Sequence, residues 1–553
     1  MRLPLLLALV IAALLVLGAR SNASDPSDRR VREALASLLG APLDQLPEAQ
    51  LVAALDAGST DGHACSFACY ALSLRYGGGV AQSGSEGYSG FRDEFWSLQQ
   101  ASQRPSCIFQ PSSANEVAVA VQLSRLLQCP FAVKSGGHAA FAGASNIEGG
   151  ITIDMKAMNH VDLLSTRHLA ALGPGAKWFD VYNALEPEGL SVVGGRVSAI
   201  GVGGLTLGGG ISFFSGLYGW ACDNVVNYEV VIANGSIINV SRDVEPDLFW
   251  ALRGGGNNFG IVTNFTVTTF SQGLMWGGGR LHRLGQRDKI IEAFANFGSN
   301  AEQDPKAAMI LSFAYSQGEY LAQIDMQYAE PVRNPPIFEN FSSSALPDPV
   351  FDTTMVRTLS NLTQLFNESN PDGLRETYWT ATYRNNADLV SFILDTYIEE
   401  IDPIRNCSGL LPACTLQFIT PPMFKHMREH GGNALGLDDE DEPLLLLNLN
   451  TMWHNELDDD AVLDAANNII QKVNEKARSM GLDHEYVYMN YASQYQDPIA
   501  GYGQENKDRL TAIAEKYDPE NVFQKLQPGY FKLGAAPSAP CVGSMTCYGK
   551  ILS

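Results

Sequence analysis

The stretch Lys134-Ser-Gly-Gly-His-Ala-Ala-Phe-Ala-Gly-Ala-Ser145 decides how this chain is organised. It follows a short apolar run, residues 131–133, which we expect to form a strand. Gly136 and Gly137 lack a Cβ, so consecutive backbone N–H groups can turn toward one point. Such a nest of amides suits a phosphate or pyrophosphate group. The stretch therefore predicts a loop that holds an anionic ligand by its backbone.

The residues around the two glycines are the first candidates for ligand contact. Lys134 adds a positive charge at the mouth of the loop, and His138 follows the glycines, where a ligand can be touched or bonded. Ser135 and Ser145 are the further candidate cofactor contacts of this stretch. A glycine-rich turn with an exposed histidine is the alternative interpretation, because so short a motif also occurs by chance.

Two more glycine-rich runs follow. They read Gly201-Val-Gly-Gly-Leu-Thr-Leu-Gly-Gly-Gly-Ile211 and Arg253-Gly-Gly-Gly-Asn-Asn-Phe-Gly-Ile-Val-Thr263. Three such loops between apolar strands indicate a large ligand held by backbone, although none spells the dinucleotide fingerprint of a Rossmann fold. The candidate cofactor contacts in these two runs are Gly203, Gly204, Gly208, Gly260 and Ile261.

In this order, and with Asp223-Asn-Val225 between them, the motifs resemble the PCMH-type FAD-binding domain of the vanillyl-alcohol-oxidase superfamily. Within it they are most similar to the fungal berberine-bridge-enzyme-like FAD-linked oxidases. The similarity runs from about residue 104 to residue 270 and resumes near the C-terminus, where Asp518-Pro-Glu-Asn-Val-Phe523 matches the family. The resemblance implies FAD as cofactor.

The resemblance also implies how the flavin is held. In the family, the histidine of the Gly-Gly-His motif carries FAD on its 8α-methyl group, and His138 matches that histidine. Many relatives attach FAD a second time through a cysteine before the second glycine-rich loop, but Val197 holds that position here. We therefore expect a single covalent attachment, through His138.

The family carries a Tyr-x-Asn-Tyr segment near the C-terminus, and Tyr488, Asn490 and Tyr491 match it. We expect residues 486–492 to form a strand beside the flavin, with Asn490 meeting polar edges of the ring. Flavin oxidation takes a hydride at N5 while the substrate loses a proton. Tyr488 and Tyr491 are the candidate catalytic bases; two core tyrosines without a catalytic role are the alternative.

The chain is too long, at 553 residues, for one hydrophobic core. The order of elements indicates an α+β protein: a two-subdomain FAD-binding domain plus a substrate domain, an antiparallel sheet with helices on one side. Glycine-rich loops stop after residue 273, where the substrate domain begins. The expected divisions are a signal peptide (1–20), an N-terminal helical and loop segment (21–95), the FAD-binding domain (96–272), the substrate domain (273–483), a return to the FAD-binding domain (484–534) and a tail (535–553).

Local patterns predict individual elements. Ser113-Ala-Asn-Glu116 is a capping box before a helix that ends ahead of Pro130, and Asn234-Gly235 is the turn of a hairpin. Residues 77–90 are expected to be a Gly/Ser loop. The substrate domain is expected to contain, among others, strands at 308–315 and 321–327 and helices at 387–400 and 459–480, together with an acidic turn at 438–442.

The first residues read as a secretory signal peptide: Arg2, an apolar run over residues 3–17, and then small residues. An uncleaved anchor is the alternative. We expect a secreted or secretory-pathway protein that has no membrane span after cleavage and is a monomer. Eight Asn-x-Ser/Thr sequons agree with secretion: Asn22, Asn234, Asn239, Asn264, Asn340, Asn361, Asn367 and Asn406.

Nine cysteines also fit an oxidising compartment. Cys407 with Cys414, and Cys541 with Cys547, are close enough in sequence for local disulfides. Two more bridges are expected among Cys65, Cys69, Cys107 and Cys129, and Cys222 is expected to be a buried free thiol. A metal site at residues 63–69 is the weaker alternative, because no second ligand pair has zinc-like spacing.

The formal net charge of −23 excludes a polyanionic partner such as nucleic acid. The expected partners are a small-molecule substrate and an electron acceptor, either oxygen or another molecule. By the resemblance, Ile200 borders the pocket where oxygen meets the flavin, and its bulk predicts slow reaction with oxygen. Three functions are considered: oxidation of a small organic molecule in secondary metabolism, a secreted carbohydrate oxidase that makes aldonolactone and hydrogen peroxide, and a flavin-binding protein without turnover.

Overall fold

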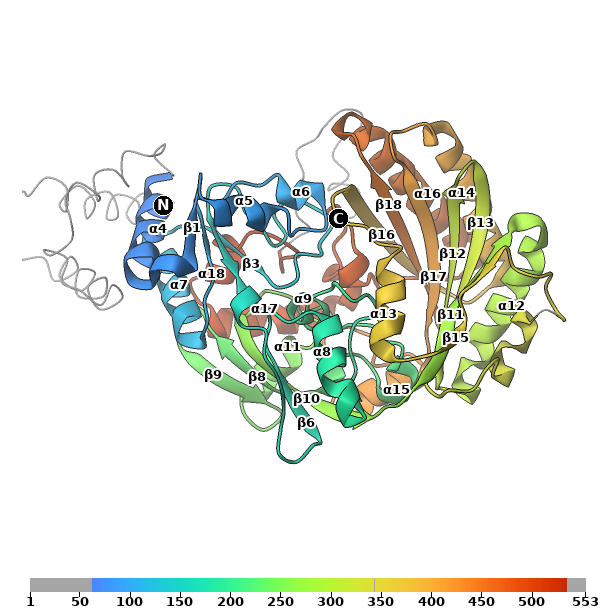
Figure 1. Cartoon of the computed structure of the whole chain (residues 1–553), viewed down its shortest axis with the longest axis horizontal. Coiled ribbons are helices and arrows are strands. Elements are labelled where there is room, and N and C mark those ends of the chain that lie inside the picture. The colour runs from blue at the N-terminus through green and yellow to red at the C-terminus, as the bar shows by residue number, and fades with distance from the viewer. Residues whose placement is uncertain (1–61, 343, 535–553) are drawn as a thin grey trace, which may run out of the picture.

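The computed structural model describes residues 62–342 and 344–534. These residues form three β-sheets: a small mixed sheet, an antiparallel sheet and a large antiparallel sheet. Figure 1 shows two lobes, and the last helices of the chain return to the lobe in which the described chain begins. The α+β class expected from the sequence is therefore confirmed.

The first sheet has the strand order β1-β2-β4-β3. Strands β2 and β3 lie parallel to β4, while β1 is antiparallel to β2. Its strands and the helices around them are β1 (Val80–Gln82), β2 (Cys107–Phe109), β3 (Phe131–Lys134), β4 (Ile151–Asp154), α4 (Gly62–Tyr76), α5 (Glu86–Arg92), α6 (Leu98–Ala101) and α7 (Ala114–Leu127). Residues 77–90 are therefore not one loop, as expected, because they contain β1 and the start of α5.

The second sheet is antiparallel, with the order β5-β6-β10-β8-β9 and a short β7 that also pairs with β10. Helix α11 lies against β9, and α17, near the C-terminus, packs on α11. The strands are β5 (Val161–Leu163), β6 (Leu169–Leu172), β7 (Leu190–Val192), β8 (Val225–Val231), β9 (Ile237–Ser241) and β10 (Ile261–Ser271). The helices of this part are α8 (Trp178–Leu185), α9 (Val202–Leu207), α10 (Ser215–Tyr218), α11 (Pro246–Ala251), α17 (Gln504–Tyr517) and α18 (Val522–Lys525).

The large sheet has the order β14-β11-β13-β12-β17-β18-β16-β19, with β15 also paired to β11. Helices α12, α14 and α16 lie along one side of it (Figure 1), as the sequence predicted. The strands are β11 (Met275–Arg283), β12 (Ala307–Ser316), β13 (Glu319–Tyr328), β14 (Phe351–Asp352), β15 (Met355–Arg357), β16 (Arg375–Arg384), β17 (Leu411–Ile419), β18 (Leu444–Trp453) and β19 (Asp483–His484). The helices are α12 (Arg287–Asn300), α13 (Leu359–Asn367), α14 (Ala387–Ile401), α15 (Pro421–Glu429) and α16 (Asp459–Met480).

The two faces of the large sheet differ in chemistry. Leu311, Ile324 and Leu416 belong to the apolar core that the helices share with the sheet. Their neighbours one residue along each strand, among them Ser312 and Asp325, line a cavity on the other face. Successive side chains of a strand point to opposite faces, so this alternation separates an apolar layer from a polar one.

Helix α7 begins and ends where the sequence signals indicated. The Ser113 hydroxyl accepts a hydrogen bond from the Glu116 N–H, and the helix ends before Pro130. The reciprocal half of the capping box is displaced by one residue, because the Glu116 carboxylate accepts from the N–H and hydroxyl of Ser112. The fixed φ of Pro130 and the left-handed Gln128 then direct the chain into β3.

Two disulfides tie α4 to the first sheet: Cys65–Cys129 and Cys69–Cys107. Because Cys65 and Cys69 are in these disulfides, neither sulfur is available as a ligand for the metal site considered at residues 63–69. Cys222 is a buried free thiol, as expected. The expected Cys407–Cys414 bridge is wrong, since both thiols are free. The Cys414 side chain is part of the core under the helices, whereas Cys407 is partly exposed.

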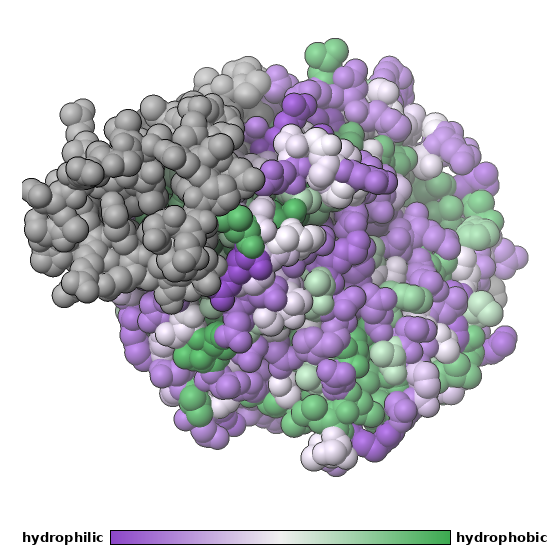
Figure 2. Space-filling model, turned by 60° about the vertical axis from the view of Figure 1, so that its left-hand side comes forward, coloured by the Kyte–Doolittle hydropathy of each residue, from purple (hydrophilic) through white to green (hydrophobic). Residues whose placement is uncertain are grey.

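Other expectations concern the surface and the ends of the chain. The face seen in Figure 2 is mostly hydrophilic, with hydrophobic residues scattered over it. Within residues 62–342 and 344–534, no helix combines the length and the apolar composition that crossing a membrane requires. The expected signal peptide, the helical segment up to residue 55, Asn22 and the Cys541–Cys547 pair lie outside the described residues.

Candidate active site

A cavity of about 810 Å³ lies between the glycine-rich loops and the polar face of the large sheet. One wall contains the loop after β3, the segment around α9 and the start of β10. The opposite wall is formed by strands β11, β12, β13, β16, β17 and β18. The C-terminal end of α13 forms part of a third side. The C-terminal segment from Tyr488 to Ala492 also reaches the cavity. The protein thus encloses one large space between its two lobes.

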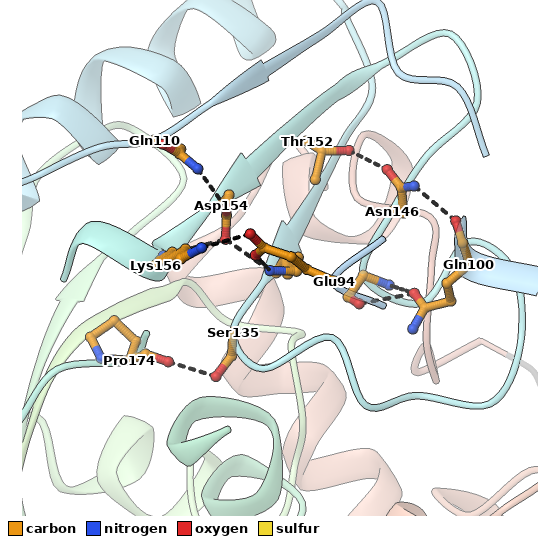
Figure 3. A network of polar contacts seen from close by, with 11 residues as sticks. Glu94, Gln100, Gln110, Ser135, Asn146, Thr152, Asp154, Lys156 and Pro174 are labelled. Atoms are coloured by element: carbon orange, nitrogen blue, oxygen red, sulfur yellow. Dashed lines mark hydrogen bonds and ion pairs between the residues drawn. The ribbon is translucent and has the colours of Figure 1, made fainter. Parts of the chain in front are cut away.

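The glycine wall depends on a backbone contact between two loops. A Cβ added at Gly136 would lie 2.4 Å from the backbone N of Gly201, and a Cβ at Gly201 would lie 2.3 Å from the N of Gly136. Ser135 supports this contact, because its hydroxyl accepts from the Gly203 N–H (3.1 Å) and donates to the Pro174 carbonyl (2.5 Å; Figure 3). The first two glycine-rich runs of the sequence therefore meet, and glycine at both positions is what permits it.

His138 lines the cavity directly after this contact. Its ring stacks on the Trp96 indole with 4.2 Å between ring centroids, and its buried Nε2 has no hydrogen-bond partner among the described residues. Burial lowers the pKa of His138 to about 4, so the imidazole is neutral near pH 7. A neutral imidazole keeps a nitrogen lone pair, which is the chemistry that covalent attachment to a flavin requires.

Lys134 lies elsewhere than at the mouth of the loop. It is buried, and its Nζ forms ion pairs with Asp154 (3.3 Å) and Glu94 (3.5 Å). Asp154 also accepts from Gln110, and Lys156 joins Glu94 in the same network (Figure 3). Lys134 does not appear in the cavity wall, so its charge stabilises the base of the loop and does not face a ligand.

The other predicted cofactor contacts are mostly brought together. Ser145 lines the cavity, and its N–H and hydroxyl both donate to Gln100 (Figure 3). Gly208 lies behind the wall: a Cβ there would be 2.0 Å from the Asn490 side-chain oxygen, so the glycine makes room for Asn490. The remaining candidates that line the cavity are Gly137, Gly203, Gly204, Gly260, Ile261 and Asn490, together with Val197 and Ile200.

The two candidate tyrosines lie in different surroundings, although both line the cavity. The buried Tyr488 hydroxyl accepts from the Ile211 N–H (3.1 Å) and from the Asn490 amide (3.0 Å). Burial raises its pKa, an effect that the nearby Tyr491 reinforces. The Tyr491 hydroxyl instead accepts from the Arg196 guanidinium at 2.6 Å.

The expected strand at residues 486–492 is wrong. The segment forms a short 3-10 helix, η11 (Met489–Tyr491), as it crosses between the lobes. A turn of this kind points Tyr488 and Tyr491 into one space, with 4.9 Å between their ring centroids. In a strand, residues three apart would point to opposite faces.

Arg196 and the residues of the sheet wall were not predicted from the sequence. Arg196 was passed over because it stands beside Val197 in a segment examined for a cysteine; the structure joins it to Gln417 and Tyr491, each at 2.6 Å. Asp325 was missed because it lies in an ordinary strand pattern. The signal that could have found this wall is the run Gly277–Gly279, since glycines inside a strand often mark a close approach.

Comparison with known proteins assigns the family. Residues 105–241 match the family model described as an FAD binding domain, and residues 487–528 match the one described as "Berberine and berberine like". The chain is 40% identical to the FAD-dependent monooxygenase tpcD of Cochliobolus heterostrophus, over 79% of this chain and 87% of that protein. It is 38% identical to the FAD-dependent monooxygenase FUP4 of Fusarium proliferatum, over 86% and 95%.

Solved structures agree on the fold. Glucooligosaccharide oxidase from Acremonium strictum superposes with a TM-score of 0.69 at 19% identity, covering 83% of this chain and 96% of that one. 6-Hydroxy-D-nicotine oxidase from Arthrobacter nicotinovorans gives 0.66 at 22% identity, covering 82% and 97%. Fold and site define a flavoprotein oxidoreductase. The chain belongs to the berberine-bridge-enzyme-like FAD-dependent oxidoreductases, among fungal relatives, and the resemblance seen in the sequence is confirmed.

Proposed function

We propose that this protein oxidises a small organic molecule by transferring a hydride from the substrate to FAD while a side chain of the cavity takes up a proton. The observation that carries the proposal is the pairing of the Tyr491 hydroxyl with Arg196 inside a cavity that His138 and the glycine wall also line. Bound FAD supplies the hydride acceptor at its N5 position. The chain itself supplies orientation, proton transfer and exclusion of water.

Tyr491 is the proton acceptor in this proposal, and Tyr488 is a positioning residue. The Tyr488 oxygen already accepts two hydrogen bonds, and its raised pKa opposes ionisation near neutral pH. The Tyr491 oxygen lies beside a guanidinium, so a negative charge on that oxygen is next to a cation. Gln417 receives a second hydrogen bond from Arg196, which fixes the direction of the guanidinium.

His138 is proposed as the single covalent attachment point of FAD. It is neutral, it lines the cavity, and its Nε2 is unpartnered among the described residues. No cysteine of the described residues lines the cavity, and Val197 stands in its wall. The same wall contains Ser135, Gly136 and Gly203, whose backbone and hydroxyl groups are the candidates for holding the rest of the cofactor.

The substrate is proposed to be a secondary metabolite, modified by alcohol oxidation, desaturation or oxidative cyclisation. The relatives support this class: besides the two monooxygenases, the bifunctional solanapyrone synthase of Alternaria solani is 31% identical over 78% of this chain. Oxygen insertion is the second candidate, because several relatives are named FAD-dependent monooxygenases. Carbohydrate oxidation receives support from fold likeness alone.

Anaerobic mixing with a panel of alcohols and polyketide-like compounds tests the proposal. A hydride donor should bleach the flavin without oxygen, and the product should lack two hydrogen atoms. A product that has gained one oxygen atom, formed in air and not anaerobically, would favour monooxygenation instead. Flavin that no donor bleaches would contradict both and favour a binding protein.

The two disulfides support passage through an oxidising compartment, and we propose the secretory pathway. Exposed Asn234, Asn239, Asn340, Asn361 and Asn406 are the accessible sequons. Asn264 and Asn367 are half-buried. The Asn367 side-chain oxygen accepts a hydrogen bond from the Ala199 N–H, and the Asn264 side-chain oxygen lies 2.9 Å from Nε2 of His160. Purified protein from a fungal host should show glycans on the exposed set and, as we propose, a monomeric mass.

A further inference from the structure

The glycine run in β11 leaves a recess in the sheet wall, and the side-chain ends of Asp325 and Gln323 lie in it. A Cβ added at Gly279 would lie 2.5 Å from an Asp325 carboxylate oxygen and 2.6 Å from the Gln323 amide nitrogen, so it would collide with both groups. Gly279 pairs directly with Asp325 across the two strands, and all three residues line the cavity. Glycine at this position therefore makes room for the carboxylate and the amide at the cavity wall.

Asp325 is the buried acid of this recess. It is 9% exposed, and its Oδ1 accepts from the Gln323 amide at 3.0 Å, while no described residue bonds its Oδ2. Among the described residues that line the cavity, the other carboxylate is Glu368, which is exposed at the end of α13. Burial raises the pKa of Asp325 to about 6, against the opposing effects of Gln323 and Arg196. At pH 7.5 it is therefore mostly ionised.

The positive and the negative charge of the cavity lining balance each other. Arg196 is the cation of the described lining, and His138 is neutral because of its lowered pKa. With Asp325 ionised, and apart from the exposed Glu368, the lining carries one positive charge on the half-buried Arg196 and one negative charge on Asp325. A carboxylate ligand would be attracted by Arg196 and repelled by Asp325, and an amine would meet the reverse. A neutral ligand avoids both penalties.

The rest of the cavity indicates a ligand with a polar end and an apolar body. The buried side-chain oxygens of Asn448 and Asn450, two residues of the cavity lining, have no partner among the described residues, although buried polar groups nearly always have one. Apolar side chains line the part near α13 and β14: Phe351, Leu365, Phe366 and Leu411.

We propose that the Gly279 recess binds a hydroxyl group of a neutral, largely apolar substrate, with Asp325 accepting its hydrogen bond. This inference rests on the proposed function, because it specifies the substrate class of the same cavity. Gln323 holds the carboxylate in place, and the unpartnered amides of the sheet wall receive further polar groups of the same molecule. Asp325 thereby selects the substrate by charge and by hydrogen bonding.

Calorimetric titration of the oxidised holoenzyme at pH 7.5 tests the proposal without turnover. The probes share one skeleton: 4-butylphenol, 4-butylanisole, 4-butylbenzylamine and 4-butylbenzoate. The wild-type protein should bind the phenol about tenfold or more tightly than the other three, since a hydroxyl–carboxylate hydrogen bond in a desolvated site is lost in the ether. Asp325→Asn leaves Arg196 uncompensated, so benzoate affinity should rise about tenfold while phenol affinity falls.

Two further variants separate charge from shape. Asp348→Asn makes the same charge change at an exposed carboxylate outside the cavity lining, where solvent screens it, and should leave the phenol-to-benzoate ratio unchanged. Gly279→Ala places a methyl group where the Asp325 carboxylate and the Gln323 amide lie, so it displaces the carboxylate without changing charge, and phenol binding should weaken with no gain for benzoate. Flavin content and the unfolding temperature verify that each variant is folded.

Equal binding of phenol and anisole by the wild-type protein would overturn the inference, as would no measurable phenol binding. An unchanged benzoate affinity in Asp325→Asn would also overturn it. These outcomes differ from failure of the proposed function. That failure would appear as flavin that no donor bleaches, while the binding preferences persist.

Discussion

Two walls face each other across the cavity: backbone atoms form one of them, and side chains form the other. The glycine wall presents backbone, with Gly136 and Gly201 close enough that neither tolerates a Cβ. The sheet wall presents side chains, such as Asp325 and Asn448, from strands whose opposite face is apolar core. A wall made of backbone constrains the residue type at each position. A wall made of side chains can change chemistry while the sheet beneath it stays the same.

The difference suggests a division of labour within the protein. The loop after β3 and the segment around α9 lie within a part of the chain that matches a family model, whereas the start of β10 and the sheet wall lie between the two matched regions. Cofactor binding should therefore fail when backbone contacts are disturbed, whereas substrate choice should respond to single side chains in the sheet. The following variants test that contrast, beginning with the largest expected effect.

Gly136→Ala should abolish the flavin-loaded protein. The added Cβ meets the Gly201 backbone at 2.4 Å, and backbone cannot move aside as a side-chain end can. Overpacking of this kind costs at least about 1–3 kcal/mol, so the unfolding temperature should fall by about 2 °C or more. Gly90→Ala is the matched control, because its Cβ would enter open space on α5, away from the cavity lining. Equal stability of both variants would show that the two loops need not touch.

His138→Ala should remove all covalently held flavin but leave the fold intact. The wild-type protein should stay yellow after acid precipitation, and the variant should release its colour into the supernatant. The expectation follows from the neutral, unpartnered imidazole and from the lack of a cysteine in the described lining. Colour that remains in the precipitate of the variant would mean that another residue carries the flavin.

Tyr491→Phe should slow flavin reduction by about 10²-fold or more, the usual contribution of acid–base assistance. Rapid mixing under anaerobic conditions measures this rate directly, and flavin content should stay unchanged. Tyr488→Phe is the paired variant; it removes two accepted hydrogen bonds but not the Arg196 contact, so its effect should be smaller. Near wild-type rates in both variants would place the proton acceptor elsewhere in the sheet wall.

Ile200→Val should have the smallest effect, a several-fold faster reaction of the reduced protein with oxygen. Ile200 lines the cavity, and removing one methylene from a close-packed wall leaves room for a small molecule. Reduction by substrate should be almost unchanged. Stopped-flow mixing of the reduced protein with aerated buffer measures the rate, and fast reoxidation in the unmodified protein would contradict the proposed restriction.

Much of the framework could be predicted from local sequence. Helix α16 was expected at residues 459–480 and occupies those residues, since an amphipathic pattern before Gly481 marks its end. The hairpin of β8 and β9 turns at Asn234-Gly235 as expected. Local signals failed where tertiary contacts override them, as at residues 486–492, where the Asn490 amide donates to the Leu205 carbonyl and the Tyr488 hydroxyl accepts from the Ile211 N–H of the facing segments.

The sequence by itself determined the family, the cofactor and the glycine wall, because close backbone approach permits glycine alone and so leaves a pattern that can be read in order along the chain. The tertiary structure alone decided that Lys134 is paired with Asp154, that Arg196 reaches Tyr491, and that Asp325 faces the cavity. These outcomes depend on contacts between residues far apart in the sequence. The alternating pattern of a strand does not reveal which of its two faces the helices cover. Which face is covered decides whether a residue lies in the core or faces the substrate.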